Sequence, residues 1–304
     1  MADFSTSLQE LQSGNIRTIA RTISLVENEV AGYDDFLTAL PHSNTPVIGI
    51  TGPPGAGKST LVDALIATLV SQRKKVGVIC VDPSSPFSLG ALLGDRIRMS
   101  EWYNHPNVYI RSLATRGSLG GLHPKIIEIT DVLKAAPFDL IIIETVGVGQ
   151  SEIEIAGLAD TTIVVVVPEA GDEVQTMKAG LMEVADIFVV NKADRPGAET
   201  FVKNLRLMVT AAMHKQVWNI PVVKTIASQK EGVEELLKQI NAHQLIAKDK
   251  SKHNWLLTEK AYHLIQIKRM KDVRKEDIKR SLEQRTKAVN LYSFVADYLR
   301  EINI

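Results

Sequence analysis

The sequence alternates short apolar, β-branched runs with stretches of helical pattern, and this alternation constrains the fold more than any other feature. The runs occupy residues 46–51, 76–81, 107–111, 139–144, 161–167, 186–190 and 221–226. Strands that are apolar on both faces are typical of parallel sheets with helices on both sides. We therefore expect an α/β fold with a mainly parallel sheet, in which ligands bind beside the carboxyl ends of the strands.

The first apolar run leads into a glycine-rich segment that reads Gly-Pro-Pro-Gly-Ala-Gly-Lys-Ser. A strand before it and the helical repeat of Leu61, Leu65 and Leu69 after it are the context of a P-loop, which binds nucleoside triphosphates. Glycines let backbone N–H groups surround the phosphates, the Lys58 ammonium neutralises their charge, and the Ser59 hydroxyl ligates Mg²⁺. The predicted nucleotide-binding residues are Gly52, Pro53, Pro54, Gly55, Ala56, Gly57, Lys58, Ser59 and Thr60.

Length and composition indicate the class of protein. The 304 residues are 45% hydrophobic and 23% charged, which suffices to bury a full core. Lys and Arg number 35 and so do Asp and Glu, so the bulk charge favours neither nucleic acid nor a membrane as partner. A single cysteine, Cys80, excludes a disulfide framework and a zinc site built from cysteines. The start of the chain lacks the pattern of a signal peptide, and the longest apolar run, residues 163–167, is too short to span a bilayer, so we expect a cytoplasmic protein.

Helical extensions flank the predicted α/β domain, which we place at residues 46–245. Residues 1–45 have a helical pattern that ends near Pro41 and Pro46. Residues 246–304 have no strand pattern and carry 14 Lys and Arg against 8 Asp and Glu. Their end forms an apolar helical stripe of Leu291, Phe294, Val295, Tyr298 and Leu299. Either the main domain covers this stripe, or the segment is an arm that pairs with a second subunit or partner.

Acidic residues after the apolar runs are predicted to complete the phosphate site. The fourth run ends in Glu-Thr-Val-Gly, where many GTPases carry Asp-x-x-Gly. We predict that Glu144 binds Mg²⁺, directly or through water, and that the N–H of Gly147 contacts the γ-phosphate. Asp82, after the second run, and Asp95, in the next helical stretch, are predicted to orient the waters of Mg²⁺ or the attacking water. Their alternatives are a helix N-cap for Asp82 and an intrahelical ion pair for Asp95.

The sequence Asn-Lys-Ala-Asp after the sixth run predicts the base. The carboxylate of Asp194 can accept hydrogen bonds from both N1–H and the exocyclic amine of guanine, whereas adenine has an acceptor at N1 and no amine at C2. Asn191 is expected to hold the base and its loop, and the stem of Lys192 to cover the ring. After the last run, the N–H of Ala227, beside Ser228, is expected to reach guanine O6, although an ordinary turn explains these two residues equally well. The predicted ligands are GTP and GDP.

These motifs together resemble the MeaB/ArgK family, the GTPase chaperones of cobalamin-dependent acyl-CoA mutases. The resemblance is carried by the P-loop, Val-Asp-Pro-Ser-Ser, Leu-Gly-Asp-Arg-Ile-Arg-Met, Glu-Thr-Val-Gly-Val-Gly-Gln-Ser-Glu, Pro-Glu-Ala-Gly-Asp-Glu-Val-Gln and Asn-Lys-Ala-Asp. It is dense over residues 46 to about 240. It implies a G domain that binds Mg²⁺ and GTP, an N-terminal helical region packed on it, and a C-terminal arm that forms a homodimer. The implied function is to gate adenosylcobalamin delivery to a mutase, and to protect or reactivate that mutase, by GTP hydrolysis.

The resemblance also implies roles for single residues. It makes Ser59, Asp82, Asp95 and Glu144 the Mg²⁺ site and Lys58 the phosphate lysine. It points to residues 169–183 as a third switch loop, in which Lys178 exchanges ion pairs with the acids Asp172 and Glu173 when the mutase docks. A solvated helix face is the alternative for Lys178. Hydrolysis is expected to be slow alone and faster with the mutase, so no catalytic base is assigned, and the candidates for an arginine finger are Arg96, Arg98, Arg111 and Arg116.

Three other functions compete with the one that the resemblance implies. A nickel-insertion chaperone should carry a His-rich tract or Cys-x-x-Cys, whereas this chain has seven scattered His and one Cys. A kinase or transport-associated ATPase is disfavoured by Asp194, and a nucleotide-binding scaffold without turnover stays open because no residue is assigned to position the attacking water. The chain lacks the Asp-x-His-x-x-Gly motif of mutases, so we expect no tightly held cobalamin. The client that the resemblance implies is a methylmalonyl-, isobutyryl- or hydroxyisobutyryl-CoA mutase, and the sequence does not choose between them.

Overall fold

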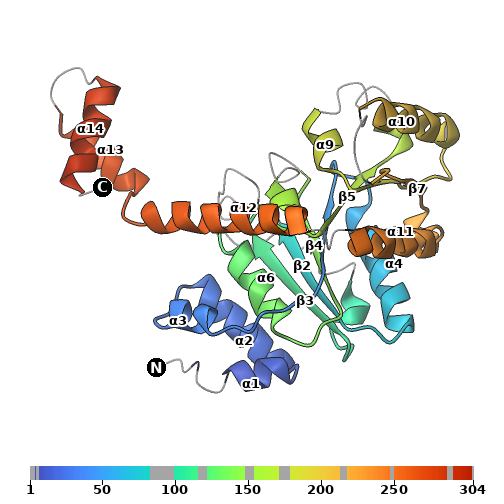
Figure 1. Cartoon of the computed structure of the whole chain (residues 1–304), viewed down its shortest axis with the longest axis horizontal. Coiled ribbons are helices and arrows are strands. Elements are labelled where there is room, and N and C mark those ends of the chain that lie inside the picture. The colour runs from blue at the N-terminus through green and yellow to red at the C-terminus, as the bar shows by residue number, and fades with distance from the viewer. Residues whose placement is uncertain are drawn as a thin grey trace. The chain divides into compact units, whose positions relative to one another are not determined.

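A computed structural model of the chain describes residues 4, 7–82, 99–115, 122–147, 154–170, 179–212, 218–246, 250–285 and 290–302 (Figure 1). It divides into two compact units, Met1–Leu256 and Leu257–Ile304, which are described separately. No helix in these described ranges is long and apolar enough to cross a membrane.

A parallel sheet of seven strands forms the centre of the first unit. Its order is β3-β2-β4-β1-β5-β6-β7, and every neighbouring pair is parallel. The strands are β1 (Val47–Thr51), β2 (Val76–Asp82), β3 (Val108–Ala114), β4 (Leu140–Glu144), β5 (Thr161–Val166), β6 (Ile187–Val190) and β7 (Val222–Lys224). Each strand lies at a predicted run, and β3 extends three residues beyond its run. The predicted α/β fold is confirmed.

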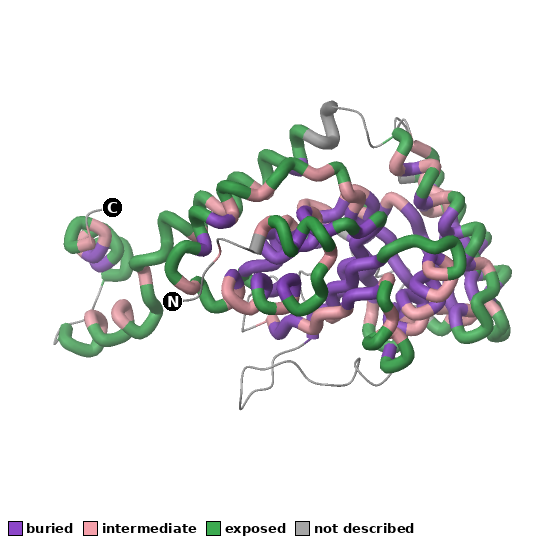
Figure 2. Tube along the Cα trace, turned by 90° about the horizontal axis from the view of Figure 1, so that it is seen from below, coloured by how far each residue is buried: buried purple, intermediate pink, exposed green. Residues whose placement is uncertain are grey.

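Helices cover both faces of the sheet, which explains why the strands are apolar throughout. On one face, α4 (Lys58–Ser71) and α11 (Val233–Ile246) share a core with alternate residues of the strands, among them Ile163 and Val165 of β5. The intervening residues Val164 and Val166 face the opposite way, into a core with α9 (Ala179–Val184) and α10 (Ala198–Ala212). This alternation is the period-two pattern of a strand buried on both faces. Figure 2 shows the buried residues gathered in these layers.

The strand order reverses at β1, which lies between β4 and β5 in the middle of the sheet. In open α/β sheets this switch point leaves a crevice at the carboxyl ends of the strands, where ligands bind. Because β1 leads directly into the predicted P-loop, the fold brings the P-loop, the end of β4 and the end of β5 together at one place.

Three helices precede the sheet in the described residues, within the segment of helical pattern: α1 (Ser7–Gln12), α2 (Ile16–Glu27) and α3 (Tyr33–Thr38). The side chain of Asn15 caps α2 by accepting a hydrogen bond from the N–H of Thr18 at 3.1 Å. The apolar face of α2 is buried through Ile19, Ile23 and Val26, and α2 packs against α6 (Ile126–Lys134). The N-terminal helices therefore belong to the same compact unit as the sheet.

The remaining helices of the described residues are α12 (Lys250–Arg269), α13 (Lys275–Glu283) and α14 (Leu291–Glu301), and short 3₁₀ helices lie at Ser100–Trp102, Ile155–Gly157, Pro168–Ala170 and Ala227–Gln229. The second unit begins within α12. On α14 the predicted stripe is only partly buried: Phe294 and Tyr298 stack with ring centroids 5.8 Å apart and are covered, whereas Leu291 and Val295 are 62% and 45% exposed. Arg285 lies over the ring of Phe294. The second unit thus keeps an apolar surface of its own.

Candidate nucleotide-binding site

The P-loop connects β1 to α4 and is held closely by the ends of neighbouring strands. Gly57, the residue before α4, has φ +88°, and a Cβ atom there would lie 2.3 Å from the Nδ2 atom of Asn191. A side chain at this position would therefore have a strained backbone and would collide with Asn191, the residue after β6. Glycine at residue 57 lets the loop approach the predicted base-binding segment.

Lys58 and Ser59 open α4, where the backbone N–H groups of a helix are free to bind an anion. The Lys58 side chain is 7% exposed, and its ammonium donates to the carbonyl oxygens of Gly52 at 2.9 Å and Pro53 at 3.1 Å. The ammonium therefore folds back over the loop that is predicted to hold the phosphates. Phosphate oxygens can replace these carbonyls because they accept the same donors with a full negative charge.

The predicted metal-binding oxygens come from three neighbouring elements. The Ser59 hydroxyl donates to Oε1 of Glu144 at 2.7 Å, and the two side chains are 6% and 3% exposed. Asp82 ends β2, the strand beside β4, and is 5% exposed. Hydroxyl and carboxylate oxygens are the ligands that Mg²⁺ prefers, so this donor set fits the ion. Asp95, the fourth predicted ligand, lies outside the described residues. Within the described part of the chain, no group of three or more His, Cys, Asp or Glu side chains forms a metal cluster.

Gly147 lies directly against the P-loop. Its φ is +81°, and a Cβ atom there would lie 2.2 Å from the carbonyl oxygen of Gly52 and 2.5 Å from the ammonium of Lys58. Only glycine fits so close to both groups. The structure therefore brings Gly147 against Lys58, three residues after Glu144, which accepts the hydroxyl of Ser59. The residues that follow, 148–153, lie outside the described residues.

Asn191 joins three loops at the predicted base site. It is 2% exposed, and its Oδ1 atom accepts hydrogen bonds from the hydroxyl of Thr225 and the N–H of Ala227, both at 3.1 Å. Its Nδ2 atom donates to the carbonyl oxygen of Ala56 in the P-loop at 2.9 Å. Because Oδ1 faces two donors and Nδ2 faces an acceptor, the orientation of the Asn191 side-chain amide is fixed. Asn191 holds the loop as expected, but the N–H of Ala227, predicted to reach guanine O6, donates to Asn191 in this structure.

The other residues of the base motif are arranged around Asn191. Lys192 has φ +55°, and its ammonium donates to the carbonyl oxygen of Gly55 at 2.8 Å. Asp194 is exposed, and its carboxylate makes no hydrogen bond or ion pair with the residues that the structure describes. Ser228 is exposed in the turn after Ala227. The carboxylate of Asp194 is thus available to a ligand, whereas Lys192 ties the motif to the P-loop.

An ion pair that the sequence analysis missed connects two loops beside the base site. Arg195, the residue after the base motif, pairs with Glu169, which lies just after β5. The hydrogen bond and positive charge of Arg195 hold the pKa of the Glu169 carboxyl below its usual range. Glu169 belongs to the predicted third switch loop, whereas Asp172, Glu173 and Lys178 of that loop lie outside the described residues. No local sequence signal relates residues 169 and 195, since only the pairing of β5 with β6 makes them neighbours.

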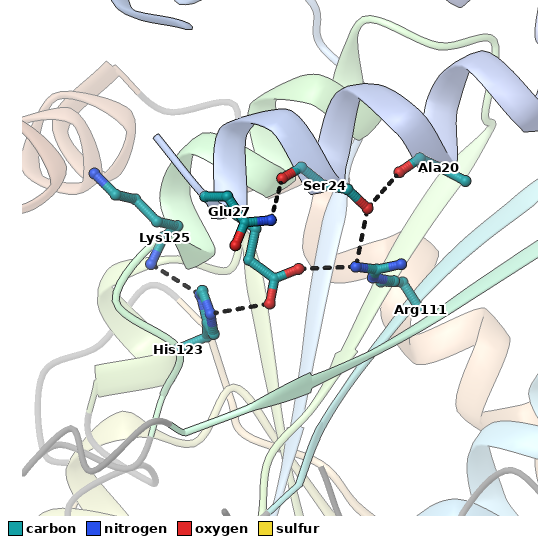
Figure 3. A network of polar contacts seen from close by, with 7 residues as sticks. Ala20, Ser24, Glu27, Arg111, His123 and Lys125 are labelled. Carbon is teal, nitrogen blue, oxygen red and sulfur yellow. Dashed lines mark hydrogen bonds and ion pairs between the residues drawn. The ribbon is translucent and has the colours of Figure 1, made fainter. Parts of the chain in front are cut away.

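Arg111, one of the candidates for an arginine finger, belongs to a polar network under the N-terminal helices (Figure 3). Its guanidinium donates to Glu27 of α2 at 2.8 Å and to the hydroxyl of Ser24 at 3.3 Å. The other carboxylate oxygen of Glu27 lies 3.7 Å from Nε2 of His123. The N–H of Lys125 donates to Nδ1 of His123, which places the proton of a neutral imidazole on Nε2, facing Glu27. The other candidates, Arg96, Arg98 and Arg116, lie outside the described residues.

The pKa values of two groups at this contact, Lys125 and Tyr109, are raised. Burial disfavours the charged form of Lys125, but hydrogen bonds and charge from Glu29 and Glu128 outweigh burial and raise its pKa. Burial raises the pKa of Tyr109 to about 12, against a smaller lowering by Arg111. The groups responsible lie at the contact between the N-terminal helices and the sheet: Glu27 ends α2, Glu29 follows it, Arg111 is in β3 and Glu128 is in α6. The network is therefore a structural contact of the N-terminal helices.

Comparisons with known proteins agree with this arrangement. The family model described as methylmalonyl Co-A mutase-associated GTPase MeaB matches residues 19–282. A putative GTPase of Pyrococcus abyssi is 48% identical over 241 residues, which cover 78% of this chain and 74% of that protein. A fused isobutyryl-CoA mutase of Geobacillus kaustophilus is 38% identical over 237 residues, which cover 73% of this chain and 22% of that protein. The crystal structure of an LAO/AO transport system kinase superposes with a TM-score of 0.71 at 27% identity and covers 100% of both chains.

Proposed function

Because the chain belongs to the family of methylmalonyl-CoA mutase-associated GTPases MeaB, we propose that it is a GTP-hydrolysing switch that serves a cobalamin-dependent acyl-CoA mutase. It gates the delivery of adenosylcobalamin to the mutase and protects or reactivates that enzyme. The observation that carries the proposal is the match to a protein named a fused isobutyryl-CoA mutase, in which a region like this chain is part of the same polypeptide. Fusion of two functions in one chain is expected where the separate proteins act together.

The roles proposed for the site residues follow from their positions. Lys58 and the backbone of residues 52–60 bind the phosphates, and the N–H of Gly147 contacts the γ-phosphate. Ser59, Asp82 and Glu144, with Asp95, hold Mg²⁺, which neutralises phosphate charge when it is bound. Asp194 selects guanine and Asn191, Lys192, Ala227 and Ser228 shape the base site.

The proposed organisation separates three functional segments. Residues 1–45 pack on the G domain at 46–245, and residues 246–304 form an arm that makes a homodimer. Support for the arm is the apolar surface of the second unit, in which Tyr262, Ile265, Leu291, Tyr292 and Val295 are exposed. We propose that Lys178, Asp172 and Glu173 exchange ion pairs when the mutase docks. We expect the protein in the cytoplasm, with no tightly bound cobalamin and no nucleic-acid or membrane partner.

The experiment that tests this function compares GTP turnover in the presence and absence of a purified mutase. Hydrolysis is expected to be slow alone and faster with the mutase, and transfer of adenosylcobalamin to the apo-mutase is expected to require GTP. The matched control replaces GTP by ATP, which Asp194 is predicted to exclude. If the mutase changes neither the rate of hydrolysis nor the affinity for nucleotide, the chaperone function is wrong.

An alternative function is a nucleotide-dependent kinase, since the structure that superposes on the whole chain is titled an LAO/AO transport system kinase. Phosphoryl transfer from ATP to a protein acceptor would support this alternative over the switch. A nickel chaperone remains disfavoured, because the chain carries seven scattered His and one Cys, which is buried.

A further inference from the structure

Two buried threonine hydroxyls join the end of β4 to the end of β1. The Oγ1 atom of Thr145 donates to Oγ1 of Thr51 at 2.9 Å, and the two residues are 2% and 0% exposed. The N–H of Thr145 donates to the carbonyl oxygen of Ile50 at 3.0 Å, which continues the parallel pairing of Ile50 with Glu144. Thr145 is therefore attached through both its backbone and its side chain to the strand that leads into the P-loop.

This attachment lies at the start of the segment that reaches the phosphate site. Glu144 accepts the hydroxyl of Ser59, and Gly147, two residues after Thr145, packs against Gly52 and Lys58. A single residue, Val146, separates Thr145 from Gly147, so their Cα atoms are at most about 7 Å apart and the position of Thr145 restricts that of Gly147. The segment 144–147 thus contacts the P-loop through Glu144 and Gly147, and between these two contacts the hydroxyl pair joins it to Thr51, the last residue of β1.

The hydroxyl pair is not needed to fill space. Valine has nearly the shape of threonine, and replacing both partners of a buried hydrogen bond by apolar groups of the same shape is close to neutral for stability. What two valines would not supply is direction, because apolar contacts are non-directional whereas a hydrogen bond prefers a defined distance and angle. The pair therefore defines where the end of β4 lies relative to the P-loop.

We propose that Thr145 is a positioning residue for GTP hydrolysis, whose hydrogen bond to Thr51 sets the distance between the N–H of Gly147 and the P-loop. This inference rests on the proposed function, since it assumes that Gly147 contacts the γ-phosphate. GDP has no γ-phosphate, so its binding depends on the P-loop and not on Gly147. Loss of the hydroxyl pair should therefore weaken binding of GTP and slow its hydrolysis while leaving GDP affinity unchanged.

The test uses the full chain and four variants of the pair: Thr145→Val, Thr145→Ser, Thr51→Val and the Thr51→Val/Thr145→Val double variant. Thr130→Val is the matched control, because it removes an equally buried threonine hydroxyl, which donates to the carbonyl oxygen of Ile126 within α6. Dissociation constants for GDP and a non-hydrolysable GTP analogue, the single-turnover rate with GTP, and the thermal midpoint are measured. Thr145→Val is expected to reduce the preference for the GTP analogue over GDP, and the turnover rate, by about five-fold each, the effect of one hydrogen bond.

The remaining variants separate positioning from folding. Thr145→Ser keeps the hydroxyl and should restore wild-type values, and Thr51→Val tests the same bond from its other end should Thr145→Val fail to fold. The double variant should regain thermal stability, because no hydroxyl is left unpaired, yet keep the GTP defect of the single variants without adding to it. An unchanged GTP preference and rate in Thr145→Val overturns the inference, and so does a GTP defect that disappears in the double variant. If the wild-type protein binds no guanine nucleotide, the proposed function itself is wrong.

Discussion

Asp194 is the single exposed carboxylate that is proposed to decide which nucleotide is bound. The residues around it are held by hydrogen bonds to the P-loop, through Asn191 to Ala56 and through Lys192 to Gly55. The carboxylate itself is exposed at the surface. The hydrogen bonds of Asn191 and Lys192 to the P-loop therefore position Asp194. A bound guanine would donate the hydrogen bonds that the described residues do not donate to its carboxylate.

Replacement of Asp194 by Asn should lower guanine affinity by about 2–3 kcal/mol, because a charged acceptor of two hydrogen bonds becomes a neutral group with one acceptor. The same variant should gain affinity for xanthosine triphosphate, whose C2 carbonyl accepts from the Asn amide. Competition of GTP, ATP and xanthosine triphosphate for the protein measures both effects. Asp272→Asn, at an exposed position of the second unit, is the control. An unchanged preference for GTP over ATP would refute the assignment of Asp194.

Among the elements, α2 is attached to the sheet by a charge network as well as by an apolar face. Glu27 and Arg111 are 12% and 27% exposed in their side chains, so their ion pair is largely shielded from water. Arg111 comes from β3, whereas its partners Glu27 and Ser24 come from α2. These contacts therefore fix the helix at one position along the strand. Buried charges that lose a partner destabilise a fold far more than exposed ones.

We expect Glu27→Ala to lower the free energy of unfolding by about 2–3 kcal/mol, because it leaves the charge of Arg111 without its carboxylate in a half-buried place. Lys74→Ala is the matched control: it breaks the ion pair with Asp139, whose side chains are 49% and 40% exposed, and should change stability by less than about 1 kcal/mol. Urea unfolding of both variants gives the comparison. Equal effects of the two substitutions would show that the Glu27 network is no stronger than a surface ion pair.

The strands followed from the sequence, and the site motifs could be proposed from it, because both signals are local. Buried parallel strands are continuously apolar, and the P-loop and base motif combine fixed spacing with residue types that the chemistry requires. The contacts between Thr51 and Thr145, Glu169 and Arg195, and Glu27 and Arg111 had no such signal. Their partners are 26 to 94 residues apart and become neighbours only through strand order and helix packing. The sequence suggested Arg111 as an arginine finger and gave no sign of its contact with α2, for the same reason.

At the scale of the whole molecule, the second unit carries an apolar surface that its own helices leave exposed. Tyr292 and Val295 of α14 are 87% and 45% exposed, beside the buried Phe294. The proposed homodimer would cover this surface. Val295→Asp is therefore expected to convert a dimer to a monomer, because it places a charge in an apolar contact.

Sedimentation of the two proteins measures this change. Ser293→Asp, at an exposed polar position of the same helix, is the control and should remain dimeric. A monomeric wild-type protein would contradict the dimer and leave the exposed surface of α14 for another partner.

The ion pair between Glu169 and Arg195 has a thermodynamic consequence for the whole molecule. It connects the segment after β5 to the loop that carries Asp194. A partner that binds this segment and breaks the ion pair would change the free energy with which the protein binds the guanine base. Linkage is reciprocal, so guanine nucleotide would then alter the affinity for that partner by the same factor. The pair is exposed, which limits this factor to about five-fold, enough to bias an exchange of nucleotide but not to drive it alone.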